Sequence, residues 1–541
     1  MESKSYKWLP HLENSIPDSA YGYTASLYTI ALEGWRRGLD LKFIKTNRSK
    51  ANTVFELSDG KVTHQFVSSR GDLVTSKALR ICRNKSLTKE YLLKNNIPTP
   101  KGRDFSKDIP NSEIIDYAKK QGYPLVVKPL DGTGGKGVIA NIETEAELKD
   151  ALSYVREELG YLHVIVEEYF EGEDYRIYVI ENEVVAATKR IRANVIGDGK
   201  TNIKKLIQKK NQEKKDSKLY RSSLIKIDKE LKDELGKREY TLDSIPSIGE
   251  KVYLKSKNNI SSGGDPVDIL DELSDEMKQI AIEGLNAIPG LPHGGIDLLV
   301  NKDKNTGVII EINSQASIRL NLFPLVGTAR DIPAKLIDFY FPNTTSNPDV
   351  PLFFEFDDVW QEFRKGNKTE YIIPSIKPDD LEITRFIVKG RVRRVGYGKW
   401  VKDNAKKLNI HGYVNHLKNG TTSIVAAGYK DDLDKFRHII VKESSSHFKI
   451  SKIVEKSRKS PVLVGFKLNN VEVDNVIEDG YHPVRLKDPT RHSNSRKKST
   501  SDKAKSNKID YKDEYHKIIN STSWKMTKPL RYIRKLIKNK V

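Results

Sequence analysis

The spacing of apolar residues predicts a small α/β unit at the start of the chain. Apolar side chains recur at helical spacing over residues 21–37, which predicts a helix. Three short β-like runs follow, over residues 41–45, 53–57 and 62–66. We therefore expect residues 1–80 to form an α/β subdomain, and no residue pattern in it indicates a chemistry.

Helical and strand patterns alternate more regularly over residues 81–342. A first helix should end near residues 95–100, where two prolines remove backbone donors. The other expected elements are helices over residues 144–158 and 274–287, and strands over residues 125–128, 164–167, 175–180, 184–191, 294–300 and 308–313. Residues 203–238 are helical and highly charged, which is typical of a solvated lid or lever.

A glycine-rich loop follows the strand over residues 125–128. Its glycines are Gly132, Gly134, Gly135 and Gly137. Glycine permits positive φ and a close approach of the backbone to a ligand, and successive N–H groups in such a loop bind anions. Lys128, at the end of the strand, adds a positive charge suited to phosphate. The pattern fits either a phosphate-binding loop or an ordinary surface hairpin, and it is neither a Walker A nor a Gly-x-Gly-x-x-Gly motif.

Two expected strands bring three oxygen ligands together. Residues 294–300 carry Asp297, and residues 308–313 end in Glu311 and Asn313. Alternation places Ile296, Leu298, Ile310 and Ile312 on the core face, so the acids should lie on the opposite face. If the strands pair, few carboxylates close together suit Mg²⁺, which takes its other ligands from water and phosphates. Each acid alone would also fit a solvated surface position.

Several separated motifs occur in one order along residues 81–342. They are Asn84-Lys85, Val127-Lys128-Pro129 with its glycine loop, Glu167-Glu168-Tyr169, Asp174-Tyr175-Arg176, Lys189-Arg190, Gly197 to Thr201, Asn259 to Asp265, Gly295-Ile296-Asp297 and Glu311-Ile312-Asn313. On these motifs the segment resembles an ATP-grasp ligase domain, in particular that of cyanophycin synthetases and fused glutathione synthetases. The resemblance implies two α+β subdomains that clasp ATP, preceded by the small α/β subdomain.

The resemblance also implies a role for each motif residue. Lys85 and Lys128 would contact the nucleotide phosphates, and the loop with Gly132, Gly134, Gly135, Lys136 and Gly137 would close over them. Glu167 and the backbone of Glu168, Tyr169 and Phe170 would hold the adenine edge, and Asp174 the ribose hydroxyls. Arg176, Lys189 and Arg190 would face the γ-phosphate or an acyl phosphate. Asp297, Glu311 and Asn313 would hold two Mg²⁺ ions, with Mn²⁺ as an alternative.

These roles describe a carboxylate–amine ligase. ATP would phosphorylate a small-molecule carboxylate, and an amine would then displace phosphate, leaving ADP and phosphate as products. Cations and positioning do most of such work, so no side-chain nucleophile is expected. The substrate would be an amino acid, a peptide or a cell-envelope precursor. The segment Ser314–Arg319 replaces a proline common in related ligases and should line the substrate pocket, where Arg319 either pairs a substrate carboxylate or is an ordinary surface residue.

A second domain is expected after a linker over residues 343–380. Residues 381–467 resemble acylphosphatase, a ferredoxin-like βαββαβ sandwich that binds phosphate with an arginine and an asparagine. Here Gly398 stands at the arginine position and His416 at the asparagine position, so we expect a degenerate domain that binds an anion rather than hydrolysing one. The alternatives are an acylphosphatase-type hydrolase and a membrane-associated nucleotide-binding module without ligase activity.

Composition adds a basic tail to this picture. Residues 481–541 contain 18 Lys/Arg and five Asp/Glu, which is +13 of the chain's net +21. Residues 468–541 should be largely disordered and end in a basic amphipathic helix, and residues 515–541 suit an anionic membrane surface. Without an aromatic stacking platform, nucleic acid is not an expected partner. With one cysteine, no signal peptide and no long apolar run, a cytoplasmic protein is expected, peripheral on the inner face of the plasma membrane and compatible with a homo-oligomer.

Overall fold

The computed structural model describes residues 6–46, 49–132, 136–217, 219–366 and 368–473. The chain divides into two compact units, Met1–Val484 and Arg485–Val541. The second unit lies outside the described residues, as do the expected C-terminal amphipathic helix and the loop glycines Gly134 and Gly135. Among the described residues, no helix is long and apolar enough to cross a membrane.

The N-terminal region is built on a five-stranded sheet with the order β19-β2-β3-β4-β5. Its strands are β2 (Asp40–Ile44), β3 (Val54–Ser58), β4 (Thr63–Val67), β5 (Arg70–Gly71) and β19 (Glu370–Ile373). Helix α1 (Ala25–Arg36) is buried over its whole length, and α10 (Ile332–Tyr340) packs beside it. The expected helix and three strands of residues 1–80 are therefore present, with boundaries shifted by a few residues.

The expected linker over residues 343–380 is wrong. The segment contains β18 (Leu352–Phe353), α11 (Phe356–Lys365) and β19, which pairs with β2. Phe353, Phe354, Phe356 and Phe363 are buried in the same core as α1. The prolines and acids that favoured a linker lie between these apolar anchors, so the segment completes the N-terminal region.

A four-stranded antiparallel sheet carries the glycine-rich loop. Its order is β6-β9-β7-β8, with β6 (Gly102–Phe105), β7 (Leu125–Pro129), β8 (Ile139–Ile142) and β9 (Val164–Glu168). Helices α4 (Asn111–Gln121) and α5 (Glu145–Leu152) bury apolar residues against it. The loop connects β7 to β8, so its ends are fixed by neighbouring strands.

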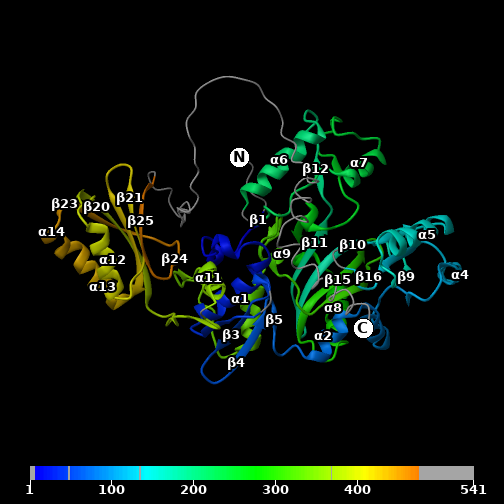
Figure 1. The fold of residues 1–541 in the computed structure, drawn as a ribbon, viewed down its shortest axis with the longest axis horizontal. Helices are drawn as coiled ribbons and strands as arrows, with labels where there is room; N and C mark the ends of the chain where they lie inside the picture. Colours follow the sequence, from blue (N-terminus) through cyan, green and yellow to red (C-terminus); the bar gives the residue numbers. More distant parts are fainter. Residues whose placement is uncertain (1–5, 47–48, 133–135, 218, 367, 474–541) are drawn as a thin grey trace, which may run out of the picture. The chain divides into compact units, whose positions relative to one another are not determined.

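The central sheet has the order β14-β11-β10-β15-β16 and is antiparallel throughout. Its strands are β10 (Glu173–Ile180), β11 (Glu183–Ile191), β14 (Asp265–Asp268), β15 (His293–Asn301) and β16 (Thr306–Asn313). Helix α8 (Asp275–Asn286), capped by Ser274, packs along it, and α2 (Ser76–Arg83) and α3 (Lys85–Lys94) contact β16 (Figure 1). Both expected hairpins, β10–β11 and β15–β16, are present.

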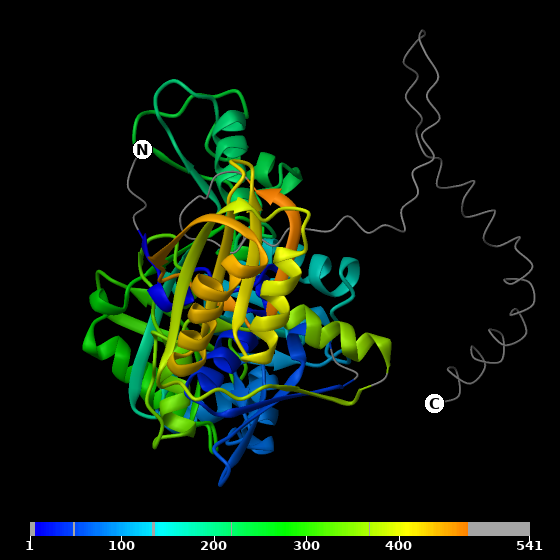
Figure 2. The ribbon, with the colours of Figure 1, turned by 90° about the vertical axis from the view of Figure 1, so that its left-hand side faces the viewer.

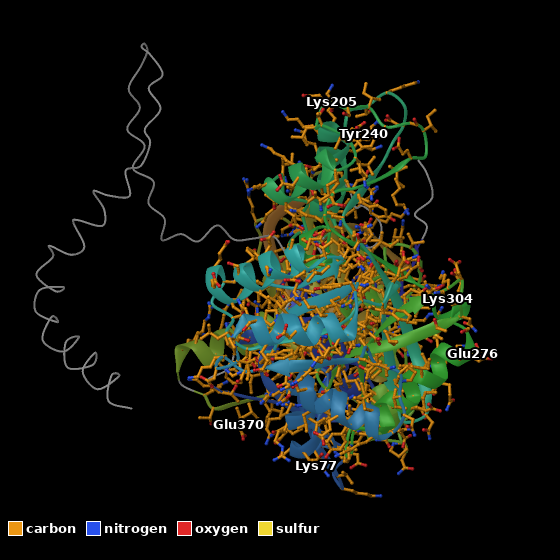
Figure 3. All side chains as sticks on the ribbon, turned by 90° about the vertical axis from the view of Figure 1, so that its right-hand side faces the viewer. Lys77, Lys205, Tyr240, Glu276, Lys304 and Glu370 are labelled. Carbon is orange, nitrogen blue, oxygen red and sulfur yellow. The ribbon has the colours of Figure 1, made fainter. Side chains whose placement is uncertain are left out.

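The charged region over residues 203–238 belongs to a small lobe with its own core. The lobe contains β12 (Asn194–Ile196), α6 (Ile203–Asp216), α7 (Lys229–Gly236) and β13 (Lys251–Tyr253). Lys205 projects from the exposed side of α6, and Tyr240 follows α7 (Figure 3). Lys210 and Lys214, also on α6, form ion pairs with Asp265 at the start of β14. These ion pairs connect the lobe to the central sheet.

The last described region has the βαββαβ order of a ferredoxin-like sandwich, as expected. Its sheet order is β23-β20-β22-β21-β25, with helices packed against one face (Figure 2). The elements are β20 (Leu381–Arg391), α12 (Tyr397–Lys407), β21 (His411–Leu417), β22 (Thr422–Tyr429), α13 (Lys430–His438), α14 (Ser444–His447), β23 (Lys449–Ser457), β24 (Val462–Leu463) and β25 (Phe466–Val473).

The other face of this sheet is covered by the N-terminal region. Tyr413, Val425 and Ala427 belong to the same buried cluster as Phe354. Strand β24 pairs in parallel with β18, and Val462 N–H donates to the Pro351 carbonyl oxygen at 2.8 Å. Backbone hydrogen bonds and an apolar face therefore join the sandwich to the N-terminal region. Two small pieces complete the description, namely the pair of β1 (Tyr6–Lys7) with β17 (Gly327–Thr328), and the short helix α9 (Arg319–Leu322).

Candidate active site

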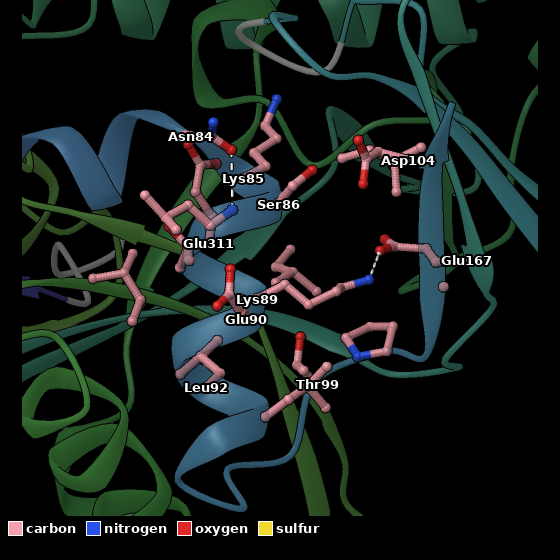
Figure 4. A pocket seen from close by; sticks show the side chains of 18 of the residues that line it. Asn84, Lys85, Ser86, Lys89, Glu90, Leu92, Thr99, Asp104, Glu167 and Glu311 are labelled. Carbon is pink, nitrogen blue, oxygen red and sulfur yellow. Dashed lines mark hydrogen bonds and ion pairs between the residues drawn. The ribbon is translucent and has the colours of Figure 1, made fainter. Parts of the chain in front are cut away.

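A cavity of about 460 Å³ lies where α3 faces the four-stranded sheet and the end of β16. Lys85 and Lys89 reach it from α3, Lys128 from β7, Glu167 from β9 and Glu311 from β16. Lys89 extends across the cavity to Glu167, while Glu311 lies near Asn84 and Lys85 (Figure 4). The structure thus brings together two predicted phosphate ligands, the predicted adenine-side acid and one predicted metal ligand.

Glu167 is held between two lysines. Its side chain is buried and forms one ion pair with Lys128 and another with Lys89. The Lys89 Nζ lies 2.7 Å from Glu167 Oε2. Burial alone would raise the pKa of Glu167, but the two ammonium groups lower it below its ordinary value. Burial in turn lowers the pKa of Lys89. Gly102 lies opposite Glu167 on β6, where a Cβ would come within 2.3 Å of the Glu167 Cβ.

The sequence-based prediction did not include Lys89. A signal for it exists, because Lys89 lies four residues after Lys85 and residues at that spacing share one face of a helix. Once Lys85 is assigned to the cavity, the same face of α3 must also present Lys89. The cavity therefore holds three lysines, one more than the motifs indicated.

We expect Glu167→Gln to lower the free energy of unfolding by about 3 kcal/mol at neutral pH, because two half-buried lysines lose their counter-ion. A carboxylate with a lowered folded pKa stabilises above its unfolded pKa and loses this contribution as the pH falls through the folded value. The difference between wild type and variant should therefore shrink as the pH falls below 4.5. Urea unfolding across this pH range measures it. The exposed Glu90→Gln is the control, and a difference that does not depend on pH would contradict the assignment.

The ends of the glycine-rich loop are described, and Lys85 contacts the first. Its Nζ donates to the Gly132 carbonyl oxygen at 2.7 Å. Burial lowers the pKa of Lys85, while the negative charge of Glu311 opposes this shift. Gly137 has a φ of +73°, and a Cβ there would lie 2.7 Å from Pro129, so this position requires glycine. Lys136 lies 5.7 Å from the centroid of the Tyr161 ring.

The predicted adenine edge is only partly available. The Glu168 N–H donates to the Lys101 carbonyl oxygen at 2.8 Å, and the Tyr169 N–H donates to the Pro124 carbonyl oxygen at 3.0 Å. The N–H groups of Glu168 and Tyr169 are therefore committed to the protein and are not free to bind adenine. No backbone acceptor for the Phe170 N–H is found in the described part of the chain.

A row of charged residues crosses the central sheet on one face. Arg176 on β10 lies directly opposite Asp297 on β15, and Asp297 lies opposite Glu311 on β16. Gly295 lies opposite Asn313 on the same pair of strands, so the three predicted metal ligands share this face. The pairing of the two strands thus brings the oxygen ligands together as the sequence pattern predicted.

One detail of the pattern is wrong. The β15–β16 register shifts at Asp297, so that Asp297 faces Glu311 while Leu298 faces Ile309. The extra residue is Ile310, which lies at the cavity, and Ile309 fills the core in its place. This bulge cannot be read from the alternation of apolar residues, because both isoleucines fit a buried position.

Arginines neutralise the acids of this face. Arg176 Nη2 donates to Asp297 Oδ2 at 2.9 Å, and Arg190 Nη2 donates to the same oxygen at 3.1 Å. Arg190 also donates its Nε to Asp174 Oδ1 at 3.0 Å. Burial alone would raise the pKa of Asp297, but Arg176 and Arg190 hold it below its ordinary value. Burial, and then the charge of Asp297, raise the pKa of Glu311, and burial also raises that of Asp174.

These residues fit a magnesium ion. Asp297, Glu311 and Asn313 present two carboxylates and one amide oxygen on the same face, and the buried Asp297 Oδ1 forms an ion pair with Arg176 Nε, so this oxygen already faces a positive charge. Within the described residues, no group of three or more His, Cys, Asp or Glu side chains could hold a metal on its own. Two carboxylates and an amide would leave coordination positions for water and phosphate oxygens, as Mg²⁺ prefers.

Lys189 does not join this site as predicted. Neighbouring residues of a strand point to opposite faces of a sheet, so Lys189 and Arg190 cannot both face the row. Lys189 lies opposite Tyr175, whose side chain is in the core, and forms an ion pair with Glu173. Arg176 and Arg190 are therefore the two cations of this face that the predicted motifs supply.

A protein-family model described as a RimK-like ATP-grasp domain matches residues 82–218. The chain contains an ATP-grasp domain. The match covers the cavity lysines, the glycine-rich loop, Glu167, Arg176 and Arg190. A second family model, acylphosphatase, matches residues 384–468, which form the ferredoxin-like sandwich.

Curated relatives match about half of this chain. A cyanophycin synthetase from Crocosphaera subtropica is 35% identical over 274 residues, covering 49% of this chain and 31% of the relative. The bifunctional glutathione biosynthesis protein GshAB of Clostridium perfringens is 32% identical over 336 residues, covering 58% of this chain and 41% of the relative. The chain thus spans between about a third and two fifths of the length of these curated relatives. A solved bifunctional glutathione synthetase from Pasteurella multocida is 23% identical with a TM-score of 0.44, covering 58% of this chain and 44% of that one.

The acylphosphatase match lacks both residues with which that family is expected to bind phosphate. Gly398 occupies the arginine position, and a Cβ there would lie 2.6 Å from Leu468 Cδ1. His416 faces the same spot, with Nε2 3.6 Å from that Cβ position and Nδ1 2.9 Å from Thr422 Oγ1. Asn415 contacts Asn469 instead, on the opposite face of β21. Leu468 therefore fills part of the space into which an arginine side chain would extend.

Proposed function

We propose that this protein is an ATP- and Mg²⁺-dependent ligase that joins a carboxylate to an amine through an acyl phosphate. The observation that carries the proposal is the cross-strand row Arg176–Asp297–Glu311 beside a cavity with three lysines, within an ATP-grasp domain. Phosphoryl transfer requires carboxylates that bind metal cations, next to lysines and arginines that bind phosphates.

Each group of residues has a separate task in this proposal. Lys85, Lys89 and Lys128 bind the nucleotide phosphates, and the Phe170 N–H binds the adenine edge. Asp174 holds the ribose once Arg190 turns to the transferring phosphoryl group, which Arg176 also contacts. Asp297, Glu311 and Asn313 hold one or two Mg²⁺ ions, with Mn²⁺ as an alternative. Bound magnesium neutralises charge on the transferring phosphoryl group.

The chemistry then follows from positioning. An oxygen of the substrate carboxylate forms a bond to the γ-phosphorus as the bond to the ADP oxygen breaks. The amine next attacks the activated carbonyl carbon, and phosphate leaves with the bond electrons while a base takes the amine proton. Closure of the glycine-rich loop over the phosphates excludes water, which would otherwise hydrolyse the acyl phosphate. The carboxylate belongs to an amino acid, a peptide or an envelope precursor.

Product analysis tests this proposal. The full chain is incubated with ATP, Mg²⁺ and a panel of amino acids and short peptides, and nucleotides and phosphate are quantified. We expect ADP and phosphate in equal amounts, dependent on magnesium and on an acid of the panel, with hydroxylamine trapping the intermediate as a hydroxamate. Release of AMP and pyrophosphate, or turnover that persists in excess EDTA, would overturn the mechanism.

A further inference from the structure

One face of the C-terminal sheet carries three cross-strand pairs of cations. Strand β20 pairs with β23, which lies at the edge of the sheet (Figure 1). Cross-strand partners share a face of a sheet, as do residues an even number of positions apart on one strand. Six cations of these two strands therefore share one face. We call them the basic strip, and the pairs are Arg385 with Lys456, Lys389 with Lys452, and Arg391 with Lys449.

The basic strip begins where the cover of this face ends. Val425, which lies opposite Arg385, is buried against the N-terminal region together with Tyr413 and Ala427. The other five cations of the strip are exposed. A ligand can therefore reach the strip without displacing the N-terminal region.

The basic strip lies on the opposite face of the sheet from the degenerate acylphosphatase position. His416 hydrogen bonds to Thr422, which lies opposite Val388 in the core under the helices. Ser423, the next residue, lies on the face of the strip, where Arg385 Nε donates to its Oγ at 2.9 Å. A ligand on the strip therefore does not enter the phosphate position expected for the acylphosphatase family.

The exposed cations of the strip repel one another. Within the described residues, no acid forms an ion pair with any of these five. On the helix side of the same sheet, by contrast, Arg437 pairs with Glu455 and Asp434. Like charges directly opposite each other destabilise a pair of strands. Lysines on an edge strand keep other strands away, but this role does not explain the cations of β20, which is an interior strand. The strip therefore indicates an anionic partner.

The spacing along the strip describes this partner. Ile387 and Val454 lie opposite each other and are half-buried, and they separate the first pair of cations from the second. The strip thus alternates charged and apolar positions over about 20 Å, since six residues of a strand rise about 3.3 Å each. This pattern matches a linear polymer whose anionic groups are joined by carbon-rich links.

Two other charged polymers match the strip less well. An acidic polypeptide lying on Ile387 and Val454 would bury N–H and C=O groups without partners, because the backbone groups of a sheet lie in its plane and not on its face. A nucleic acid that stacks its bases needs aromatic side chains. The described residues of β20 and β23 present none on this face. A phosphodiester polymer with aliphatic or sugar links has neither requirement.

We infer that the basic strip binds a linear phosphodiester polymer through its backbone. The phosphates contact the paired lysines and arginines, and the carbon-rich links lie over Ile387 and Val454. This binding is separate from the ligase reaction, because no residue of the strip lines the cavity with the three lysines.

The test uses a labelled abasic oligodeoxynucleotide, which is a phosphodiester polymer without bases. Fluorescence anisotropy measures its binding to the full chain over a range of salt concentrations. We expect the double variant Lys389→Gln with Lys452→Gln to raise Kd at least about 10-fold at about 0.15 M salt. The slope of log Kd against log salt should become shallower by about 1.4, because each phosphate contact contributes about 0.7. The variant also loses a repulsion, so it should unfold at the wild-type temperature or above it.

The control removes the same charge from the other side of the sandwich. Lys406→Gln with Lys407→Gln changes two exposed lysines of α12 and should keep the wild-type Kd and slope. The basic residues 481–541 are present in every chain compared, so their contribution cancels. An oligothymidylate should bind no more tightly than the abasic polymer.

Four results would overturn the inference. They are no binding of the abasic polymer, an equal loss of affinity in the control, much tighter binding of oligothymidylate, and an equal effect of the strip variant on poly-L-glutamate or on phosphatidylglycerol vesicles. The third result would assign the strip to nucleic acid, and the fourth to an acidic polypeptide or a membrane.

Discussion

Replacing Glu311 with glutamine should lower ADP formation by about 10³-fold or more. Glu311 faces Asp297 across the strand pair, and its carboxylate is one of two that can hold a cation between the sheet and the phosphates. The amide has nearly the same shape but carries no charge. Metal ions contribute several kcal/mol to charge stabilisation in phosphoryl transfer, and each 1.4 kcal/mol is a factor of ten in rate.

The loss should not come from unfolding. The pKa of Glu311 is raised, so the folded protein already disfavours its charged form, and the neutral amide should be tolerated. Steady-state ADP release at saturating ATP measures the effect, and circular dichroism reports the fold. Glu283→Gln, on the exposed side of α8, is the matched control and should turn over at the wild-type rate. Wild-type turnover by Glu311→Gln would refute the site.

Replacing Lys128 with alanine should lower ADP formation by about 10²- to 10³-fold and weaken nucleotide binding. Lys128 reaches the cavity from the strand that leads into the glycine-rich loop, so it can supply positive charge to phosphates bound in the cavity. Removing a cation that is held in place for the transferring group typically costs a few kcal/mol in the transition state. The remaining partner of Glu167 is Lys89, so the acid stays neutralised and the fold should persist.

The measurement for Lys128→Ala combines ADP release with calorimetric titration of an ATP analogue. Lys94→Ala is the control, because Lys94 lies on α3 but is 65% exposed and forms its ion pair with Glu90, outside the predicted phosphate ligands. A Lys128 variant that binds the analogue as tightly as wild type and turns over normally would remove this residue from the site. Loss of secondary structure in the variant would show that Glu167 needs both lysines.

Much of the site could be predicted because it depends on local patterns. The hairpin of β15 and β16 follows from two apolar strands and a polar turn, and pairing them places Asp297 opposite Glu311. Two details differ from the prediction, for different reasons. The side chains of Lys189 and Arg190 point to opposite faces of the sheet because the two residues are neighbours on β11. The prediction treated them as one motif and so gave them one role. The core position of Ile309, in place of Ile310, depends on a bulge that has no sequence signal.

The region between the two domains shows the same limit at a larger scale. Its prolines and acids are typical of a connection, yet Phe353, Phe354 and Phe356 need a core to cover them. That core is supplied by α1, more than 300 residues earlier in the chain. Some apolar residues pack against a part of the chain that is distant in sequence. The sequence alone does not distinguish them from the apolar residues of a loosely packed linker.

The pairing of β18 with β24 limits how this protein can be divided into separately expressed fragments. A cut between residues 373 and 381 would separate the two domains in sequence but would leave Phe354 on one piece and Val425 on the other, both facing water. Each piece would also carry an unpaired strand edge, which favours association with other chains. The acylphosphatase-like region is therefore best studied as part of the intact protein. Substitutions within this region, at His416 on β21 for example, separate its contribution more cleanly than truncation.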